Sequence, residues 1–314
     1  MTTVAVQSRV PAFPSLLGNT SSPGTVAQSS SGSGRRLSDL LLVHIPKTAG
    51  ASLFAQLASV FDVHGNSVSS ETCLPPYREG NKPRVVLLRS PRAHVVSQYL
   101  ECRHSDWGLY TQRKFAGKKG FRDRYVVGKS DVEGLTAWAD HFVAHAWPPN
   151  ADPTAIDFLC YDPRDMQTRA LTCQSNRTFA NHHVAASEVA GWHPNATEAM
   201  RNALQPGVIL GLSELYRASV CLVHYHLQKR LAPGCACTDV AINRSFMLEH
   251  ETHGIPHLDV DALPPPLQLR IDRLTLVDQV VYVRLAQKVP NPNPNPNPNP
   301  DPNPNPNPNL TLTT

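Results

Sequence analysis

The chain has 314 residues, of which 41% are hydrophobic and 17% are charged, a composition typical of a globular protein with one substantial core. The net charge of +4 favours an anionic ligand but lacks the clustering expected of a nucleic-acid-binding protein. No run of about 18 apolar residues is present, so no transmembrane helix is predicted, and the N-terminal residues lack the apolar core of a signal peptide.

Three segments differ in composition. Residues 1–37 form a Ser/Gly-rich lead that has little to bury, so this segment is expected to be disordered. Residues 38–289 alternate apolar and polar stretches and are expected to form one catalytic domain. Residues 290–314 are dominated by an Asn-Pro repeat, in which each proline lacks an amide donor and restricts the residue before it. This low-complexity tail is therefore expected to join neither a helix nor a sheet.

Within the central segment, predicted strands alternate with predicted helices. Strands are expected at 36–45, at 82–89 and at 207–212, with a possible short one at 61–65. Helices are expected at 51–61, 91–104, 131–147, 162–173 and 213–231, the last with Ser213 as its N-cap, followed by a final helical element over 266–289. This order predicts an α/β fold with an open parallel sheet covered on both faces, and places ligands at the carboxyl ends of the strands.

Seven cysteines leave at least one unpaired within the chain, and their spacing is compatible either with disulfides or with reduced thiols. Sequons for N-glycosylation occur at five positions: Asn19, Asn176, Asn195, Asn243 and Asn309. Together these features favour a lumenal, disulfide-permissive compartment.

The segment VHIPKTAGASLF, residues 43–54, runs from a predicted strand through a small-residue turn into a predicted helix. Free amides at a helix start carry partial positive charge, Lys47 adds a full charge, and Thr48 and Ser52 add hydroxyl donors, so the turn suits a phosphate or sulfate. It is not a Walker A loop, because the lysine precedes the turn and Gly50 is its single glycine. The alternative is a tight turn with a surface lysine.

A second segment, LLRSPRAHVVSQY at 87–99, sharpens this interpretation. Arg89 ends a predicted strand, and Ser97 lies two turns into the helix that follows. A guanidinium and a hydroxyl in these positions can converge on one phosphate, with arginine giving the bidentate contact. An arginine at a strand end is, however, often only a solvated cap.

Together, HIPKTAGAS and LLRSPRAHVVSQY resemble the P-loop-like sulfotransferases that use 3′-phosphoadenosine 5′-phosphosulfate (PAPS), in particular the carbohydrate branch that includes heparan sulfate 2-O- and 6-O-sulfotransferases. Residues 165–173 and 208–223 look like later blocks of the same family. The resemblance implies a P-loop NTPase-like three-layer fold. It also implies that Lys47, Thr48, Ala49, Gly50, Ala51 and Ser52 surround the phosphosulfate, and that Arg89 and Ser97 hold the 3′-phosphate. The family's second arginine falls on His94 here, which is left out of the binding set.

The implied reaction moves a sulfuryl group from PAPS to a hydroxyl group, with Lys47 stabilising the leaving oxygen and no metal required. In the 2-O- and 6-O-sulfotransferases a histidine between the two motifs is the base, and this position is matched by His64. A structural or solvated role for His64 is the alternative. His182 and His183 are reserve candidates.

The resemblance implies a hydroxylated acceptor, expected to be a glycan or glycoconjugate, and a Golgi or secretory location. The basic residues Arg113, Lys114, Lys118, Lys119, Arg122 and Arg124 could line a groove for an anionic polysaccharide, although such runs are more often solvated loops. Two other classes stay open: a P-loop kinase, which should show a glycine-rich loop and an acidic metal ligand, and a non-catalytic glycan- or nucleotide-binding descendant of the fold.

Overall fold

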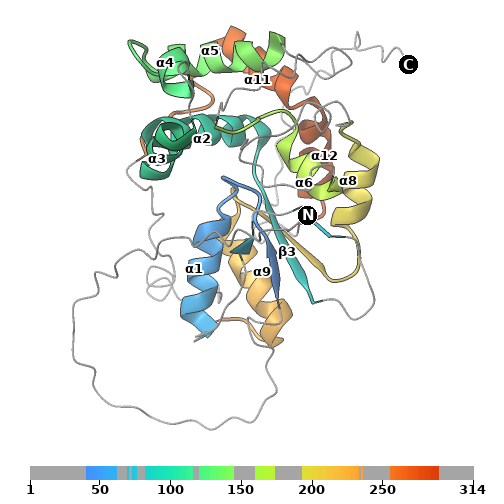
Figure 1. Cartoon of the computed structure of the whole chain (residues 1–314). Coiled ribbons are helices and arrows are strands. Elements are labelled where there is room, and N and C mark those ends of the chain that lie inside the picture. The colour runs from blue at the N-terminus through green and yellow to red at the C-terminus, as the bar shows by residue number, and fades with distance from the viewer. Residues whose placement is uncertain are drawn as a thin grey trace, which may run out of the picture. The chain divides into compact units, whose positions relative to one another are not determined.

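The computed structural model describes residues 40–61, 69–70, 73–75, 82–115, 120–144, 160–173, 193–232, 235 and 255–289 (Figure 1). The N-terminal lead up to residue 39 and the Asn-Pro tail from residue 290 lie outside the described residues. Residues 62–65 of the possible short strand at 61–65 lie outside them as well. The described residues form a mixed α/β structure in which a small parallel sheet is flanked by helices.

The sheet contains four parallel strands in the order β2-β1-β3-β4. Their bounds are β1 Leu41–Val43, β2 Ser69–Ser70, β3 Arg84–Leu88 and β4 Val208–Leu212. In the register of the two central strands Val43 pairs with Val86, and β3 then pairs with β4 along its whole length. The three longer strands fall inside the predicted ranges, and their parallel order confirms the predicted parallel sheet.

The helices before the second half of the chain are α1 Gly50–Phe61, α2 Pro91–His104, α3 Asp106–Phe115, α4 Phe121–Tyr125 and α5 Asp131–Ala144. The later helices are α6 Met166–Thr172, α8 Ala196–Ala203, α9 Tyr216–Gln228, α11 Pro265–Leu274 and α12 Leu276–Ala286. The helices α3, α4 and α8 were not predicted, and the final predicted element is two helices that meet at Thr275.

Two apolar cores lie on opposite faces of the sheet, because successive strand residues point to opposite sides. On one face Leu42, Val85 and Ile209 pack with residues of α1 and α9. On the other face Val43, Val86 and Leu210 join a larger core with α2, α5, α6, α11 and α12. Figure 1 shows α1 and α9 together at the strands and the remaining helices apart from them. The sheet is therefore the middle of three layers.

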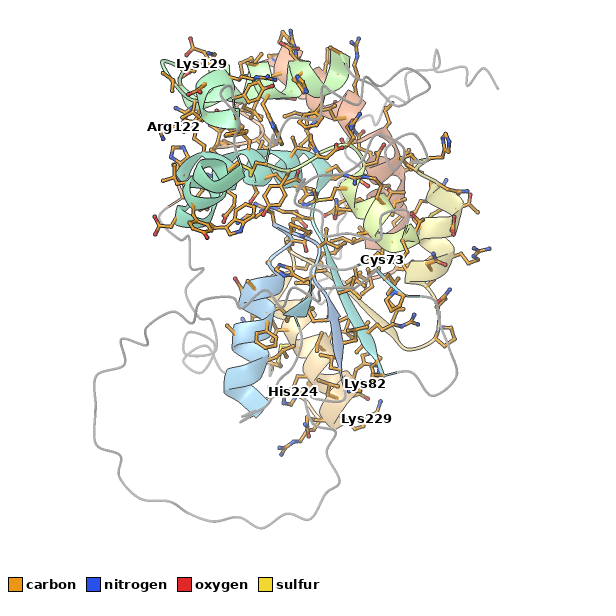
Figure 2. The ribbon with its side chains drawn as sticks, viewed as in Figure 1. Cys73, Lys82, Arg122, Lys129, His224 and Lys229 are labelled. Atoms are coloured by element: carbon orange, nitrogen blue, oxygen red, sulfur yellow. A yellow bond between two sulfur atoms is a disulfide. The ribbon has the colours of Figure 1, made fainter. Side chains whose placement is uncertain are left out.

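Three disulfides join described cysteines: Cys73–Cys173, Cys102–Cys160 and Cys221–Cys235. Cys73 is labelled in Figure 2. Three bridges are compatible with an oxidising, secretory environment. Among the helices of the described residues, none combines the length and the apolarity needed to cross a bilayer.

Candidate functional site

The candidate site lies at the carboxyl ends of β1 and β3, where the strand order reverses. The chain leaves β1 through α1 toward β2 on one side, and β3 lies on the other side of β1. Loops that follow two such strands diverge and leave a crevice between them. The two segments singled out in the sequence, after Val43 and after Leu88, are those two loops.

A cavity of about 580 Å³ opens at this crevice. It is lined by seven of the predicted site residues: Lys47, Ala49, Gly50, Ala51, Ser52, Arg89 and Ser97. Among the predicted binding residues that the structure describes, Thr48 does not line the cavity, since its side chain is buried and its hydroxyl donates to the carbonyl of Ile45 at 2.9 Å. The structure thus gathers the two motifs at one cavity but gives the Thr48 hydroxyl a role inside the loop.

The loop adopts an unusual backbone to reach α1. Lys47 and Ala49 have φ values of 66° and 65°, in the left-handed region that costs a non-glycine residue about 1–2 kcal/mol. Gly50, the first residue of α1, is needed for space: a Cβ there would lie 2.3 Å from Cδ2 of the His44 ring. Helix α1 therefore begins directly against the strand end, with its first residues at the cavity.

Hydrogen bonds from three other elements hold this strained loop from behind. The hydroxyl of Ser213 donates to the carbonyl of Thr48 at 2.8 Å, and also lies 3.1 Å from the carbonyl of Leu88. The prediction that Ser213 caps a helix is wrong, because α9 begins at Tyr216 with Leu215 as its N-cap. The residue is used instead to join the ends of β3 and β4 to the loop.

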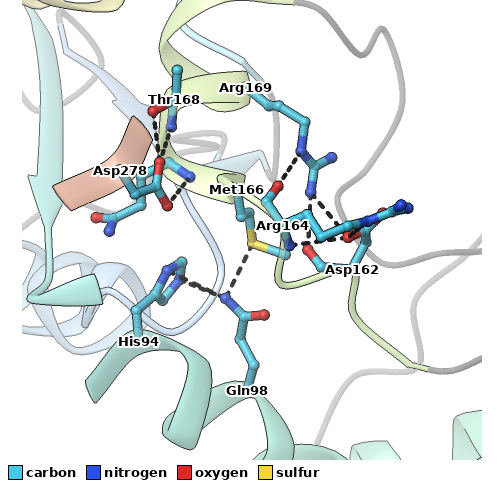
Figure 3. A network of polar contacts seen from close by, with 9 residues as sticks. His94, Gln98, Asp162, Arg164, Met166, Thr168, Arg169 and Asp278 are labelled. Atoms are coloured by element: carbon cyan, nitrogen blue, oxygen red, sulfur yellow. Dashed lines mark hydrogen bonds and ion pairs between the residues drawn. The ribbon is translucent and has the colours of Figure 1, made fainter. Parts of the chain in front are cut away.

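His94 supplies the second support. It is buried on α2, and its Nε2 lies 2.7 Å from the carbonyl of Pro46, which can only accept, so Nε2 is the donor. Burial, reinforced by the positive charges of Arg89 and Lys47, lowers the pKa of His94 to about 3. The ring is therefore neutral at pH 7 and Nδ1 accepts from the amide of Gln98, at 3.2 Å (Figure 3). His94 therefore supports the loop, and it is not among the described residues that line the cavity.

Arg89 joins the two motifs directly. Its Nη1 donates to the carbonyl of Lys47 at 3.1 Å. Burial lowers the pKa of the guanidinium, and the negative charge of Glu214 acts in the opposite direction. The Gln167 side chain holds the backbone of Arg89, accepting from its amide and donating to its carbonyl, each at 2.9 Å. These contacts fix the Arg89 side chain and backbone in the lining of the cavity.

The first turn of α6, which carries Gln167, is itself anchored by α12, the last described helix. Asp278 of α12 accepts from the amide and hydroxyl of Thr168 at 2.7 and 2.6 Å, and from the amide of Gln167 at 3.2 Å (Figure 3). In return Asp165 accepts from the amides of Val277 and Asp278. The two carboxylates therefore cap each other's helices, α6 and α12.

Two further cavity residues were missed by the sequence reasoning. Glu101, one turn after Ser97 on α2, accepts a hydrogen bond from Nζ of Lys47 at 2.5 Å. Its spacing of four residues from Ser97 could have suggested it, since such residues share a helix face. His44, the last residue before the loop, also lines the cavity, and burial with the charge of Lys47 lowers its pKa to about 4. His44 is therefore neutral at pH 7.

The cavity lining also includes an aromatic pair and an acidic segment. Trp107 of α3 and Tyr161 line the cavity and stack, with ring centroids 5.2 Å apart and an interplanar angle of 22°. The segment 255–261, which leads into α11, lines the cavity as well and contributes Asp259 and Asp261.

Several predicted residues are not placed. His64, His182 and His183 lie outside the described residues, so the histidine base stays a prediction. Of the basic run, Lys118 and Lys119 also lie outside them. Arg122 and Arg124 belong to α4, whose position Figure 2 marks with Arg122, and neither lines the cavity.

Comparison of the chain with protein-family models, with curated proteins and with solved structures gives no significant match. Within the described ranges no group of three or more His, Cys, Asp or Glu side chains is arranged to hold a metal ion.

Proposed function

We propose that the protein is a sulfotransferase that moves a sulfuryl group from PAPS to a hydroxyl of an acceptor, expected to be a carbohydrate. The observation that carries the proposal is the contact of Arg89 with the Lys47 loop across one cavity, which Ser97 also lines. Two cationic side chains, two hydroxyls and a helix start face one space there, a donor set that suits a ligand with two separated anionic groups.

The finer fold assignment belongs to the same proposal. A parallel sheet between two helical layers, with an anion-binding loop between the first strand and the first helix, is compatible with a P-loop NTPase-like fold. The lysine before the turn and the single glycine distinguish this loop from an ATP-binding one.

Each cavity residue then has a chemical role. The start of α1 and the hydroxyl of Ser52 would hold the equatorial sulfate oxygens, and Lys47 would neutralise the charge that grows on the departing oxygen. Arg89 and Ser97 would hold the 3′-phosphate. During transfer the acceptor oxygen bonds to sulfur, the bond from sulfur to the 5′-phosphate oxygen breaks, and the acceptor proton passes to a base. Lys47 must first exchange its Glu101 partner for the sulfate.

The cellular setting is part of the proposal as well. A PAPS-dependent enzyme that acts on glycans would work in the Golgi lumen, and three disulfides are compatible with that oxidising compartment. His64 remains the proposed base, on the strength of its position between the two motifs.

Calorimetric titration with 3′-phosphoadenosine 5′-phosphate (PAP), AMP and ATP tests the proposal. PAP should bind at least ten times more tightly than AMP, because only PAP carries the group that Arg89 and Ser97 would hold. The variant Arg89→Lys should lose most of this preference while retaining AMP binding. Tighter binding of ATP with magnesium than of PAP would indicate a kinase, and absence of binding to all three would reject the proposal.

A further inference from the structure

A stacked aromatic pair faces the cavity beside the lysine that the proposed reaction needs. Trp107 is half-buried and Tyr161 is almost fully buried, and both line the cavity that contains Lys47 and Glu101. Flat aromatic faces beside hydrogen-bonding groups suit the apolar face of a sugar ring, whose hydroxyls point outward from its edge. A carboxylate such as Glu101 supplies the acceptor for those hydroxyls.

This pair is built rigidly around Glu101. The Cys102–Cys160 disulfide joins the residue after Glu101 to the residue before Tyr161. Trp107 is fixed by its neighbour Gly108, where a Cβ would lie 2.5 Å from the carbonyl oxygen of Glu101, so that only glycine lets α3 approach α2 this closely. We refer to Glu101, Trp107 and Tyr161 as the aromatic platform. Ligand sites held in this way bind at lower entropic cost.

The order of residues along α2 separates this platform from the 3′-phosphate end. Arg89 precedes α2, Ser97 lies within it, and Glu101 follows Ser97 by one turn, about 6 Å along the helix axis; α3, which carries Trp107, begins after the helix ends. Glu101, which accepts from Lys47, therefore lies between Ser97 and Trp107 in the chain, and all four residues line the same cavity. A hydroxyl bound on the platform would be next to the sulfuryl group that Lys47 holds.

The charges around the cavity limit which acceptor can enter. Among the described residues that line it, carboxylates outnumber Lys and Arg: Glu101, Asp259 and Asp261 against Lys47 and Arg89. His257 lines it too and adds positive charge only when protonated. Both cations belong to the donor end, so an acceptor would meet negative charge.

Arg92 interacts electrostatically with Asp261 of this acidic segment, but its guanidinium is paired with a different carboxylate. Arg92 makes two hydrogen bonds of 2.6 Å to the carboxylate of Asp272. The hydrogen bonding to Asp272, with a smaller contribution from the negative charge of Asp261, raises the pKa of Arg92. Repulsion between like charges would therefore disfavour an acceptor that carries uronate or sulfate groups on the reacting ring.

We propose that the aromatic platform is an acceptor subsite for an uncharged sugar ring, and that Asp259 and Asp261 select against polyanionic glycans. The subsite rests on the proposed sulfotransferase function. It differs from the sequence expectation that a basic run lines a groove for an anionic polysaccharide.

The test compares two tetrasaccharides of similar size on the full chain: the neutral N-acetylglucosamine tetramer and the uronate-containing tetramer of the unsulfated heparin backbone. Each is titrated into protein saturated with PAP, and each is offered as an acceptor with radiolabelled PAPS. The neutral probe should bind and react at least tenfold better. Equal or better use of the anionic probe, or no binding of either probe while PAP binds, would overturn the subsite; loss of PAP binding itself would instead reject the proposed function.

Two sets of variants sharpen the result. Asp259→Asn keeps the oxygen that accepts from the amide of Asp261, and should improve binding of the anionic probe roughly fivefold, an effect that falls at high salt. Asp123→Asn, a carboxylate of α4 away from the cavity, is the matched control and should change nothing. Trp107→Ala should weaken the neutral probe more than Trp107→Phe does, with PAP affinity retained in both; equal losses in the two variants, or none, would contradict the platform.

Discussion

The Arg89 guanidinium donates to the carbonyl of Lys47 at 3.1 Å, so the second motif supports the backbone of the first. A cation that helps to shape the neighbouring anion loop can tighten both ends of the site at once.

Replacing Lys47 by alanine should abolish sulfuryl transfer, with a loss of at least 10²-fold in kcat, because the charge on the leaving oxygen would be unopposed. The fold should persist, since the Lys47 side chain has its described ion pair at the cavity and not in the core. Turnover of radiolabelled PAPS measures the effect, with exposed Lys288→Ala as the control. Unchanged kcat in Lys47→Ala would contradict the role.

Replacing Glu101 by glutamine should tighten PAP binding about fivefold, because a negative charge beside the anion site is removed and Lys47 is released from its ion pair. The same change should raise KM for the sugar acceptor, whose hydroxyls would lose a strong hydrogen-bond acceptor. Calorimetry and initial rates separate the two effects. Weaker PAP binding would show that Glu101 supports Lys47 instead of competing for it.

Gly50→Ala should destabilise the fold by about 1–3 kcal/mol through overpacking, since the new Cβ would collide with the His44 ring. In the double variant His44→Ala/Gly50→Ala the ring is gone and most of this loss should disappear. Urea unfolding of the four proteins of the cycle measures the coupling. Strict additivity of the two single changes would mean that the collision is relieved in another way.

The stability of the protein should fall as the pH rises through the titration of Asp165. Burial, together with the negative charge of Asp278, raises the pKa of Asp165 from its ordinary value of 3.8 to about 7, against the smaller opposing effects of its hydrogen bonds and of Arg169. The folded state therefore binds more protons than the unfolded state between those two values, and its stability is lost over that window.

Asp165→Asn is the variant for this effect. It keeps the oxygen that accepts from the amides of Val277 and Asp278 and removes the titration. Its urea midpoint should therefore change less between pH 5 and pH 7.5 than that of the parent protein. Equal pH dependence in both proteins would assign the titration to another group, with Asp278, whose pKa is raised as well, as the first to examine.

Asn195 caps α8, accepting from the amide of Glu198 at 3.0 Å, so Asn195→Ala should cost about 1 kcal/mol in unfolding free energy. Asn195→Asp retains the accepting oxygen and should be nearly neutral. The comparison is made on protein produced without glycosylation, because Asn195 is also the first residue of a sequon. A loss in the aspartate variant as large as in the alanine variant would rule out the cap as the cause.

The sequence predicted the layered sheet because its strands are short apolar runs separated by helical periodicity, and α2 was predicted with the bounds that it has in the structure. It missed α3, α4 and α8, whose sequences are rich in polar residues and show no long apolar stripe. The helix predicted at 266–289 is broken at Thr275, where the backbone leaves the helical region (φ −127°, ψ 27°), and α12 begins anew with Asp165, distant in the sequence, accepting from the amides of Val277 and Asp278.

Lys47 and Arg89, which the sequence singled out by their charge and by their order along the chain, line one cavity in the structure. The site was not predictable where contacts come from distant segments. Glu101 can be assigned to the site only through its contact with Lys47, which lies 54 residues earlier in the chain. The aromatic platform in turn depends on a disulfide between residues that are 58 apart. Ser213, which holds the loop, and Gln167, which holds the backbone of Arg89, likewise come from segments distant in the sequence.

Reciprocal capping between α6 and α12 links the last described helix to the backbone of Arg89, and so to the proposed nucleotide site. A polypeptide that stopped before Asp278 would still contain every residue expected to touch the ligand, yet the turn that carries Gln167 would lose its anchor and the Arg89 backbone its clamp. Frameshifts or proteolytic cuts in that last helix should therefore inactivate the molecule as surely as damage to the loop itself.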